Sequence, residues 1–258
     1  MANSASGDSV VERVVRILAA FPESADAVQL TELANRAGLP QATAHRLVRQ
    51  LAEQGLLEAG PGGSVRMGLR LWELVNRSSP ALQLRQAAAP FMEDIQQVLN
   101  QNVNLAVLEG WEALFVERMS RRGSVANRAR IAGRMPVHVS SAGVALMSHQ
   151  AREVQARYLA QFHDPAGKVT ADDVRGLLAE ASRLGYAQLA GVVDPDTWGI
   201  AVPVADQQGR TVAALGVVVP LKEARIQALV PALRTAARGI GRQLGRQPGS
   251  GTLPRTAT

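Results

Sequence analysis

Three helical patterns and one hairpin pattern follow one another within the first 70 residues of the chain. In the first pattern, apolar residues recur at helical spacing from position 10 to position 18. Because an amphipathic helix buries only one of its faces, we expect the charged residues between them, Glu12, Arg13 and Arg16, to lie on the outside.

The short segment Ala37-Gly38-Leu39-Pro40 separates the second and third helical patterns. We expect Thr31 to cap the second helix and Gly38 to end it in the left-handed conformation. Pro40 suits the first turn of the third helix, where a backbone N–H has no partner in any case. The apolar residues of the third helix share one face: Ala44, Leu47, Val48 and Leu51.

Two short strand patterns, at 56–59 and 65–68, flank the Gly/Pro-rich turn at 60–64. Three helices followed by such a hairpin, or wing, predict a winged helix-turn-helix domain over residues 8–69. The next segment, 70–100, is helical again, with an interruption near Pro80 and a bend or restart expected at Pro90. We interpret it as a linker helix region.

The remainder of the chain alternates between strand and helix patterns. Strands are expected at 103–109, 113–119, 124–131, 185–193, 199–205 and 211–219, and helices at 140–148, 153–162, 171–184 and 226–244. Residues 101–246 are therefore predicted to form an α+β domain with one antiparallel sheet, followed by a disordered tail at 247–258.

Composition removes several classes of protein. Without cysteine the chain has no disulfide, catalytic thiol or thiolate metal site, and we expect an intracellular, cytoplasmic protein. No apolar run is long enough to span a membrane, and residues 1–8 lack the basic residues of a secretory signal.

The formal charge of +6 suggests nucleic acid, but it does not lie in the predicted DNA-binding domain. Residues 1–70 hold seven basic and seven acidic side chains, and the remaining 21 basic and 15 acidic residues follow. Basic residues concentrate between Arg121 and Arg134 and in the tail. DNA binding must therefore be argued from pattern, not from bulk charge.

The polar face of the third helix is the strongest functional signal. Gln, Thr and Arg side chains near the start of a recognition helix can read base edges in the major groove, and Arg49 and the wing residue Arg66 suit the phosphate backbone. A solvated polar face is the alternative explanation. The predicted DNA-contacting residues are Gln41, Ala42, Thr43, His45, Arg46, Arg49 and Arg66.

Signals for catalysis are weak. No G-x-S-x-G motif occurs, Ser140 and Ser141 beside His138 lack a spaced acid, and the histidines show no metal-ligand spacing. We expect no cofactor, no metal and no catalytic residue. A small-molecule-processing enzyme with an accessory helix-turn-helix, and a nucleic-acid-coating protein that uses the basic segment 121–134, remain as alternatives.

Short motifs in order along most of the chain resemble those of the IclR family of bacterial transcriptional regulators. They include Leu33-Ala34…Gly38-Leu39-Pro40…Thr43-Ala44-His45-Arg46-Leu47, Arg134-Met135-Pro136-Val137-His138…Ser141-Ala142-Gly143, Gly185-Tyr186-Ala187 and Ile200-Ala201-Val202-Pro203-Val204. The resemblance implies a winged helix on double-stranded DNA, a GAF-like effector-binding domain, and dimers or tetramers on palindromic operators.

The resemblance also implies a pocket for a small-molecule effector. Its residues here would be Asn127, Met135, Ser140, Ser141, Ala142, Leu189, Trp198, Gly199, Ile200, Gly216 and Val218. Family members that bind small oxo-acids use polar groups at the positions of Leu189, Gly199, Gly216 and Val218. Because these residues cannot compensate the desolvation of a small anion, we expect a larger, partly apolar organic acid.

Overall fold

The computed structural model describes residues 8–22, 26–120, 125, 127–223 and 225–246. The chain divides into two compact units, Met1–Ser79 and Pro80–Thr258.

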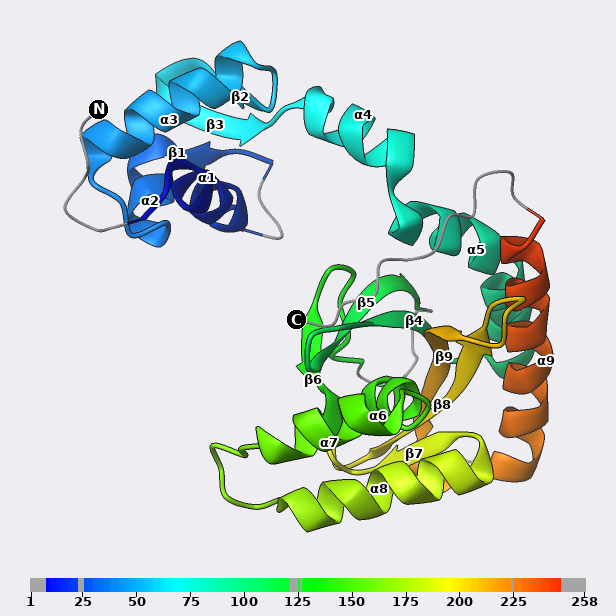
Figure 1. Ribbon diagram of the computed structural model, residues 1–258. Coiled ribbons are helices and arrows are strands. Elements are labelled where there is room, and N and C mark those ends of the chain that lie inside the picture. Colours follow the sequence, from blue (N-terminus) through cyan, green and yellow to red (C-terminus); the bar gives the residue numbers. More distant parts are fainter. Residues whose placement is uncertain (1–7, 23–25, 121–124, 126, 224, 247–258) are drawn as a thin grey trace. The chain divides into compact units, whose positions relative to one another are not determined.

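The first unit is a winged helix-turn-helix (Figure 1). Its helices are α1 (Val10–Ala19), α2 (Leu30–Arg36), α3 (Gln41–Glu53) and α4 (Leu69–Ser78). Its strands are β1 (Val28–Gln29), β2 (Leu57–Ala59) and β3 (Ser64–Met67), which form an antiparallel sheet in the order β1-β3-β2. The predicted wing is confirmed, and β1 adds a third strand to it.

A capping box begins α1. Ser9 Oγ accepts a hydrogen bond from the Glu12 amide at 3.1 Å, and Glu12 Oε2 accepts one from the Ser9 amide at 2.6 Å. The expected orientation of this helix was partly wrong, because Arg13 is 8% exposed and lies on the same face as the buried Ile17. Its Nε donates to the Ser9 carbonyl at 3.3 Å. An arginine can bury its long apolar stem in a packed face while its charged end reaches a polar partner.

The second helix has its N-cap two residues earlier than expected. Gln29 is its N-cap residue and makes no side-chain cap, so Thr31 is not the cap. Gln29 is also the last residue of β1 and pairs with Ser64, and the helix begins directly after this strand. The expected left-handed ending is confirmed, with φ +60° at Gly38. Pro40 precedes the first turn of α3 as its N-cap residue.

The segment predicted as a linker contains two helices with different surroundings. Helix α4 has no buried side chain among its described residues. Helix α5 (Pro80–Leu99) continues through Pro90 without restarting, and it buries Leu84, Met92 and Ile95 in the core of the second unit. Residues 80–99 are therefore part of that unit.

The second unit has one antiparallel sheet in the order β6-β5-β4-β9-β8-β7. Its strands are β4 (Asn102–Glu109), β5 (Glu112–Met119), β6 (Arg134–Pro136), β7 (Ala187–Ala190), β8 (Thr197–Ala205) and β9 (Thr211–Pro220). Its helices are α5, α6 (Ser141–Met147), α7 (Arg152–Ala160), α8 (Ala171–Leu184) and α9 (Ile226–Leu244). The predicted α+β class with an antiparallel sheet is confirmed.

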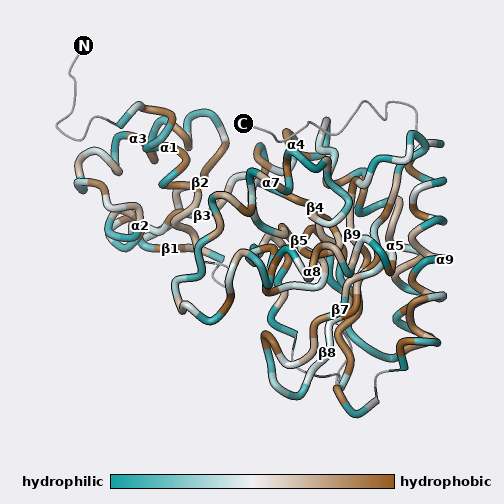
Figure 2. The backbone as a smooth tube through the Cα atoms, turned by 60° about the horizontal axis from the view of Figure 1, so that its bottom comes forward, coloured by the Kyte–Doolittle hydropathy of each residue, from teal (hydrophilic) through white to brown (hydrophobic). Residues whose placement is uncertain are grey.

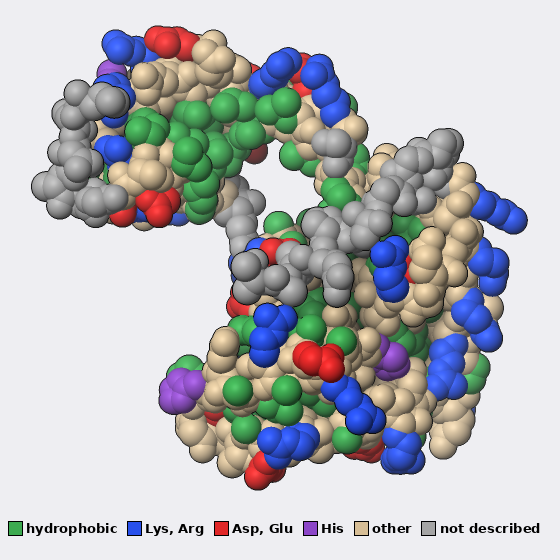
Figure 3. All heavy atoms as spheres, in the orientation of Figure 1, with side chains coloured by type: hydrophobic (Ala, Val, Ile, Leu, Met, Phe, Trp, Pro, Cys, Tyr) green, Lys and Arg blue, Asp and Glu red, His purple; other side chains and the backbone are tan. Residues whose placement is uncertain are grey.

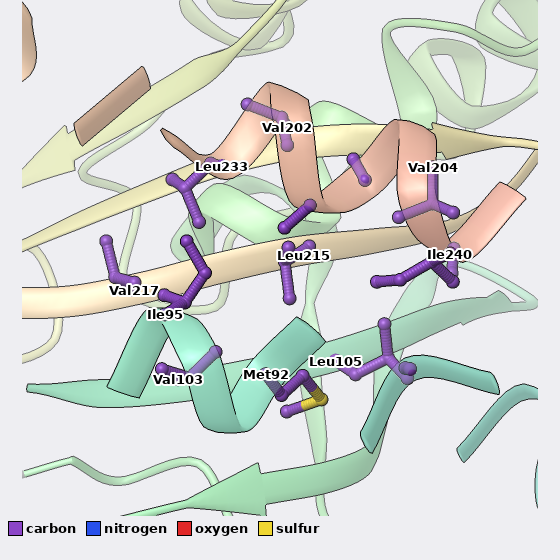
Figure 4. Close-up of a cluster of buried hydrophobic side chains, with 14 of the residues drawn as sticks. Met92, Ile95, Val103, Leu105, Val202, Val204, Leu215, Val217, Leu233 and Ile240 are labelled. Carbon is purple, nitrogen blue, oxygen red and sulfur yellow. The ribbon is translucent and has the colours of Figure 1, made fainter. Parts of the chain in front are cut away.

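Helices cover both faces of this sheet (Figure 1). Helices α5 and α9 pack on one face, and α9 alternates between hydrophobic and hydrophilic positions in Figure 2, as a helix with one buried side does. Figure 4 shows Met92 and Ile95 from α5, and Leu233 and Ile240 from α9, converging on the strands. Helices α6, α7 and α8 pack on the opposite face around a second apolar cluster.

Two expected strands differ from the structure. In place of a strand at 124–131, the described residues 125 and 127–130 have no regular secondary structure, and the edge strand β6 follows at 134–136. The strand expected at 185–193 is the shorter β7, because the left-handed Gly185 ends α8 and residues after Ala190 turn. The tail at 247–258 lies outside the described residues. No helix among the described residues is long and apolar enough to cross a membrane.

Candidate functional site

Helix α3 separates its apolar face from its polar face as expected. Ala44, Leu47, Val48 and Leu51 are buried in the core of the first unit. The predicted DNA-contacting residues on the other side are exposed, apart from the half-buried Thr43: Gln41, Ala42, His45, Arg46 and Arg49. The wing residue Arg66 is also exposed.

Three of these side chains have partners within the first unit. Arg66 Nε donates to Glu58 Oε2 at 2.8 Å across the wing, and Arg49 Nε lies 3.7 Å from Glu53 Oε1. Gln41 Nε2 donates to the Thr31 carbonyl at 3.2 Å, which holds the first turn of α3 against α2. Arg46 has only a long contact to a neutral group, so it is the least constrained cation of the recognition helix.

Arg16 is a positioning residue that the sequence pattern placed on the outside. Its Nε donates to the Ala37 carbonyl at 2.8 Å and its Nη2 to the Gly38 carbonyl at 2.6 Å, while Nη1 pairs with Asp8. These carbonyls end α2 and have no partner in a helix, so a cation suits them. Arg16 therefore fixes the turn that sets the angle of α3.

The second unit contains a cavity that opens to solvent, on the sheet face that carries α6. Most of the predicted effector-binding residues line it: Asn127, Met135, Ser140, Ser141, Ala142, Leu189, Gly199, Gly216 and Val218. The cavity thus unites the sheet, the loop before α6 and the loop after β7.

Trp198 and Ile200 do not line this cavity. Alternate residues of a strand point to opposite faces of the sheet, and Thr197 and Gly199 of β8 lie on the cavity side. Ile200 is fully buried in the cluster beneath α5 and α9, and Trp198 packs against the same cluster.

Part of the cavity lining was not among the predicted residues. The additional residues are Asn104, Phe115, Arg128, Ala129, Val139, Val192, Val193, Asp194, Thr197 and Val217. Strand parity would have found Thr197 next to Gly199. Arg128 lies within the strand expected at 124–131, and Asp194 follows the strand expected at 185–193, so neither was a candidate.

Two glycines form a low floor for the cavity. A Cβ atom at Gly199 would lie 2.9 Å from Ser141 Oγ, and one at Gly216 would lie 3.0 Å from the Ile200 carbonyl oxygen. Real Cβ atoms essentially never make a contact as short as that at Gly199 and rarely one as short as that at Gly216, so each glycine allows its neighbours to approach closely. At these two positions the cavity is lined by residues without a side chain.

Several polar groups of the wall already have partners. Asn127 Nδ2 donates to Asn104 Oδ1 at 2.9 Å, and the Ala129 amide donates to Asn127 Oδ1 at 3.0 Å. Ser140 Oγ accepts from the Gly143 amide at 2.8 Å as the cap of α6. No described residue accepts a hydrogen bond from Asn104 Nδ2, so this amide can donate to a ligand.

The same region holds no arrangement for catalysis among the described residues. The His138 ring packs edge-on against Phe162 at 4.9 Å, and burial lowers the His138 pKa against the opposing effect of Asp164. It makes no hydrogen bond to Ser140 or Ser141 there. No group of three or more potential metal ligands occurs in the described ranges either.

Comparison with known proteins gives a consistent result. A model of the IclR helix-turn-helix domain matches residues 10–61, and a model of the bacterial transcriptional regulator IclR C-terminal domain matches residues 78–242. The HTH-type transcriptional regulator XynR of Escherichia coli K12 is 26% identical over 210 residues, which are 80% of this chain and 83% of that protein. The transcriptional repressor IclR of the same organism is 27% identical over 182 residues, covering 68% and 66% of the two chains.

A solved structure is more similar. The crystal structure of an IclR homolog from Microbacterium hydrocarbonoxydans, complexed with 4-hydroxybenzoate, is 43% identical with a TM-score of 0.85, and the match covers 93% of this chain and 100% of that one. A winged helix-turn-helix joined to a domain with a ligand-sized cavity defines a transcriptional regulator with a separate effector-binding domain. The chain belongs to the IclR family of bacterial transcriptional regulators, whose members are not enzymes.

Proposed function

We propose that the protein is a cytoplasmic regulator that binds a palindromic operator as a dimer or tetramer and is switched by a small organic acid. The exposed polar face of α3 carries the DNA-binding part of this proposal. Arg46 and His45 are its base-reading candidates together with Gln41, Ala42 and Thr43, and Arg49 and Arg66 are its phosphate contacts.

Arg46→Ala tests this interface. Operator binding in a gel-shift titration should weaken by roughly 1–3 kcal/mol, because a base contact from a recognition helix has about this value. Arg36→Ala is the matched control, since Arg36 is an exposed arginine of α2 that pairs with Glu32. Equal operator affinities for the wild type and Arg46→Ala would remove Arg46 from the interface.

The cavity supports an effector with an apolar, flat body and an acid group. Its glycine floor and its Phe115, Met135 and Leu189 side chains suit such a body, and they offer little to a very small polar anion. The relative from Microbacterium hydrocarbonoxydans was crystallised with 4-hydroxybenzoate, which has this shape.

Calorimetry of the full chain tests the effector class. We expect binding of 4-hydroxybenzoate and no measurable binding of glyoxylate or pyruvate. The reverse order of affinities would refute an aromatic effector.

Self-association is supported by an apolar surface on the first unit. Helix α4 has ten residues and no buried side chain at positions 69–77, and Leu69, Trp72 and Val75 are 74%, 66% and 53% exposed. An isolated helix of this length is marginally stable in water, so α4 needs a partner. Val11 and Val15 of α1 are exposed as well, and Figure 3 shows hydrophobic side chains gathered over α1. We propose a second copy of the chain as the partner of this surface, because a palindromic operator requires two recognition helices.

A further inference from the structure

Two charged side chains line the otherwise mainly apolar cavity of the second unit. Arg128 is exposed and forms no hydrogen bond or ion pair with any described residue. Asp194 is half-buried, and only its Oδ1 atom is engaged, by the Asp196 amide at 3.1 Å. Its Oδ2 atom has no donor among the described residues. Each group therefore has hydrogen-bonding capacity that the described residues do not use.

The sheet places these two charges on opposite sides of the cavity. Arg128 follows Asn127, which is bonded to Asn104 on β4. Asp194 is tied to the start of β8, because Thr197 Oγ1 donates to its carbonyl at 2.9 Å. Strand β9 lies between β4 and β8, so Asn104 and Thr197, which hold the two charged residues, lie two strands apart across the sheet. They are also offset along the strands, because Asn104 is level with Gly216 and Ala201, whereas Thr197 is level with Pro220. The glycine floor, Gly199 and Gly216, lies on β8 and β9 between them.

The two groups select opposite chemistry. A guanidinium only donates hydrogen bonds and attracts an anion, and the free amide of Asn104 reinforces it on the same side. An ionised carboxylate only accepts hydrogen bonds, so Asp194 repels a second carboxylate and binds a hydroxyl that can donate. A ligand that satisfies both must carry an acid at one end and a hydroxyl at the other.

We propose that this cavity recognises hydroxylated aromatic acids by both ends, with the carboxylate at Arg128 and Asn104 and the ring hydroxyl donating to Asp194. Asp194 is then the residue that distinguishes a hydroxylated ring from an unsubstituted or O-methylated one. The inference rests on the proposed aromatic effector and adds the residues that set its specificity.

Calorimetry on the full-length protein with three probes, 4-hydroxybenzoate, benzoate and 4-methoxybenzoate, tests this. The wild type should bind 4-hydroxybenzoate about tenfold more tightly than either analogue, since a hydrogen bond to a charged group is lost. Asp194→Asn keeps the Oδ1 acceptor of the turn but replaces Oδ2 with a donor. We expect it to abolish or reverse the preference for 4-hydroxybenzoate over 4-methoxybenzoate while benzoate affinity does not fall.

Replacing Arg128 should change the three affinities in a different pattern. Arg128→Gln should weaken all three acids by about tenfold or more and leave their ratios unchanged. Asp196→Asn and Arg134→Gln are matched controls. Both residues are exposed, lie near Asp194 and Arg128 in the sequence, and do not line the cavity. Both should behave as wild type.

The outcomes separate the two levels of the hypothesis. If the acids bind but Asp194→Asn leaves their ratios unaltered, two-ended recognition is wrong and the aromatic effector stands. If none of the three acids binds the wild type, the aromatic effector and this inference both fail.

Discussion

At the scale of single residues, the proposed DNA-contacting arginines differ in whether they are free. Arg66 and Arg49 each have a carboxylate partner, whereas Arg46 has none. DNA phosphate must displace those carboxylates before it can bind the arginines, and the carboxylates also repel the phosphate directly. The acidic partners therefore limit the affinity of the free protein for DNA.

Glu58→Gln should strengthen DNA binding. An exposed ion pair contributes at most about 1 kcal/mol, so releasing Arg66 is expected to raise affinity for non-specific duplex DNA up to about fivefold. The slope of log affinity against log salt concentration should steepen by up to about one phosphate contact. Fluorescence anisotropy across a salt series measures both quantities.

Asp172→Asn is the control for this experiment, because it releases Arg175 from an exposed pair in the second unit. It should leave the affinity and the slope unchanged. Weaker DNA binding by Glu58→Gln would mean that Glu58 holds Arg66 in its binding position.

Residue positions near a helix boundary were the hardest to predict. A period of 3.6 indicates that α1 has an apolar stripe that begins at Val10, but Arg13 is buried and Val10 is 52% exposed. An arginine has enough apolar stem to replace a valine in a packed face, and hydropathy alone does not show this. Arg16 contacts backbone carbonyls 21 and 22 positions away, and no local pattern encodes such a contact.

At the scale of elements, long periodic segments were predictable and short ones were not. The apolar positions of α3 and α9 and the central strands β4, β8 and β9 repeat often enough to define a period. Strand β1 has two residues and exists because β3 pairs with it. The cavity residues were predicted through the family resemblance, and the failures at Trp198 and Ile200 follow from ignoring alternation along β8.

Helix α5 gives the clearest test at this scale. Its sequence was interpreted as part of a linker, whereas in the structure its apolar residues belong to the core of the second unit. Met92 is fully buried in contact with the sheet. Met92→Ala should destabilise the second unit by about 2–5 kcal/mol, the cost of deleting a large side chain from a packed core.

Urea unfolding in a Trp72→Phe background measures this loss. The remaining tryptophans, Trp111 and Trp198, both report on the second unit. Gln97→Ala is the control, since Gln97 is an exposed residue of the same helix. A change below about 0.5 kcal/mol for Met92→Ala, as for a typical surface position, would contradict a core role for α5.

At the scale of the whole molecule, the excess of basic over acidic residues follows residue 70 of the sequence. Arginines recur every four residues along the exposed side of α9, at Arg234, Arg238 and Arg242, and Figure 3 shows a row of basic side chains over this helix. The first 70 residues are formally neutral. A single recognition helix makes few contacts, and the first 70 residues have no net charge to assist it. We therefore propose that operator affinity depends on joining two copies.

We expect a charge on the apolar face of α4 to prevent two copies of the chain from associating. Trp72→Glu places a charge in the middle of the face, and a buried tryptophan at an interface typically contributes 2 kcal/mol or more, roughly a thirtyfold change in association. Light scattering after size exclusion should show a loss of dimer, and palindromic operator binding should fall with it. Val98→Glu is the matched control, because Val98 of α5 is 77% exposed and belongs to the other unit. If Val98→Glu dissociates the protein and Trp72→Glu does not, the subunits meet through the second unit, and the exposure of α4 needs another explanation.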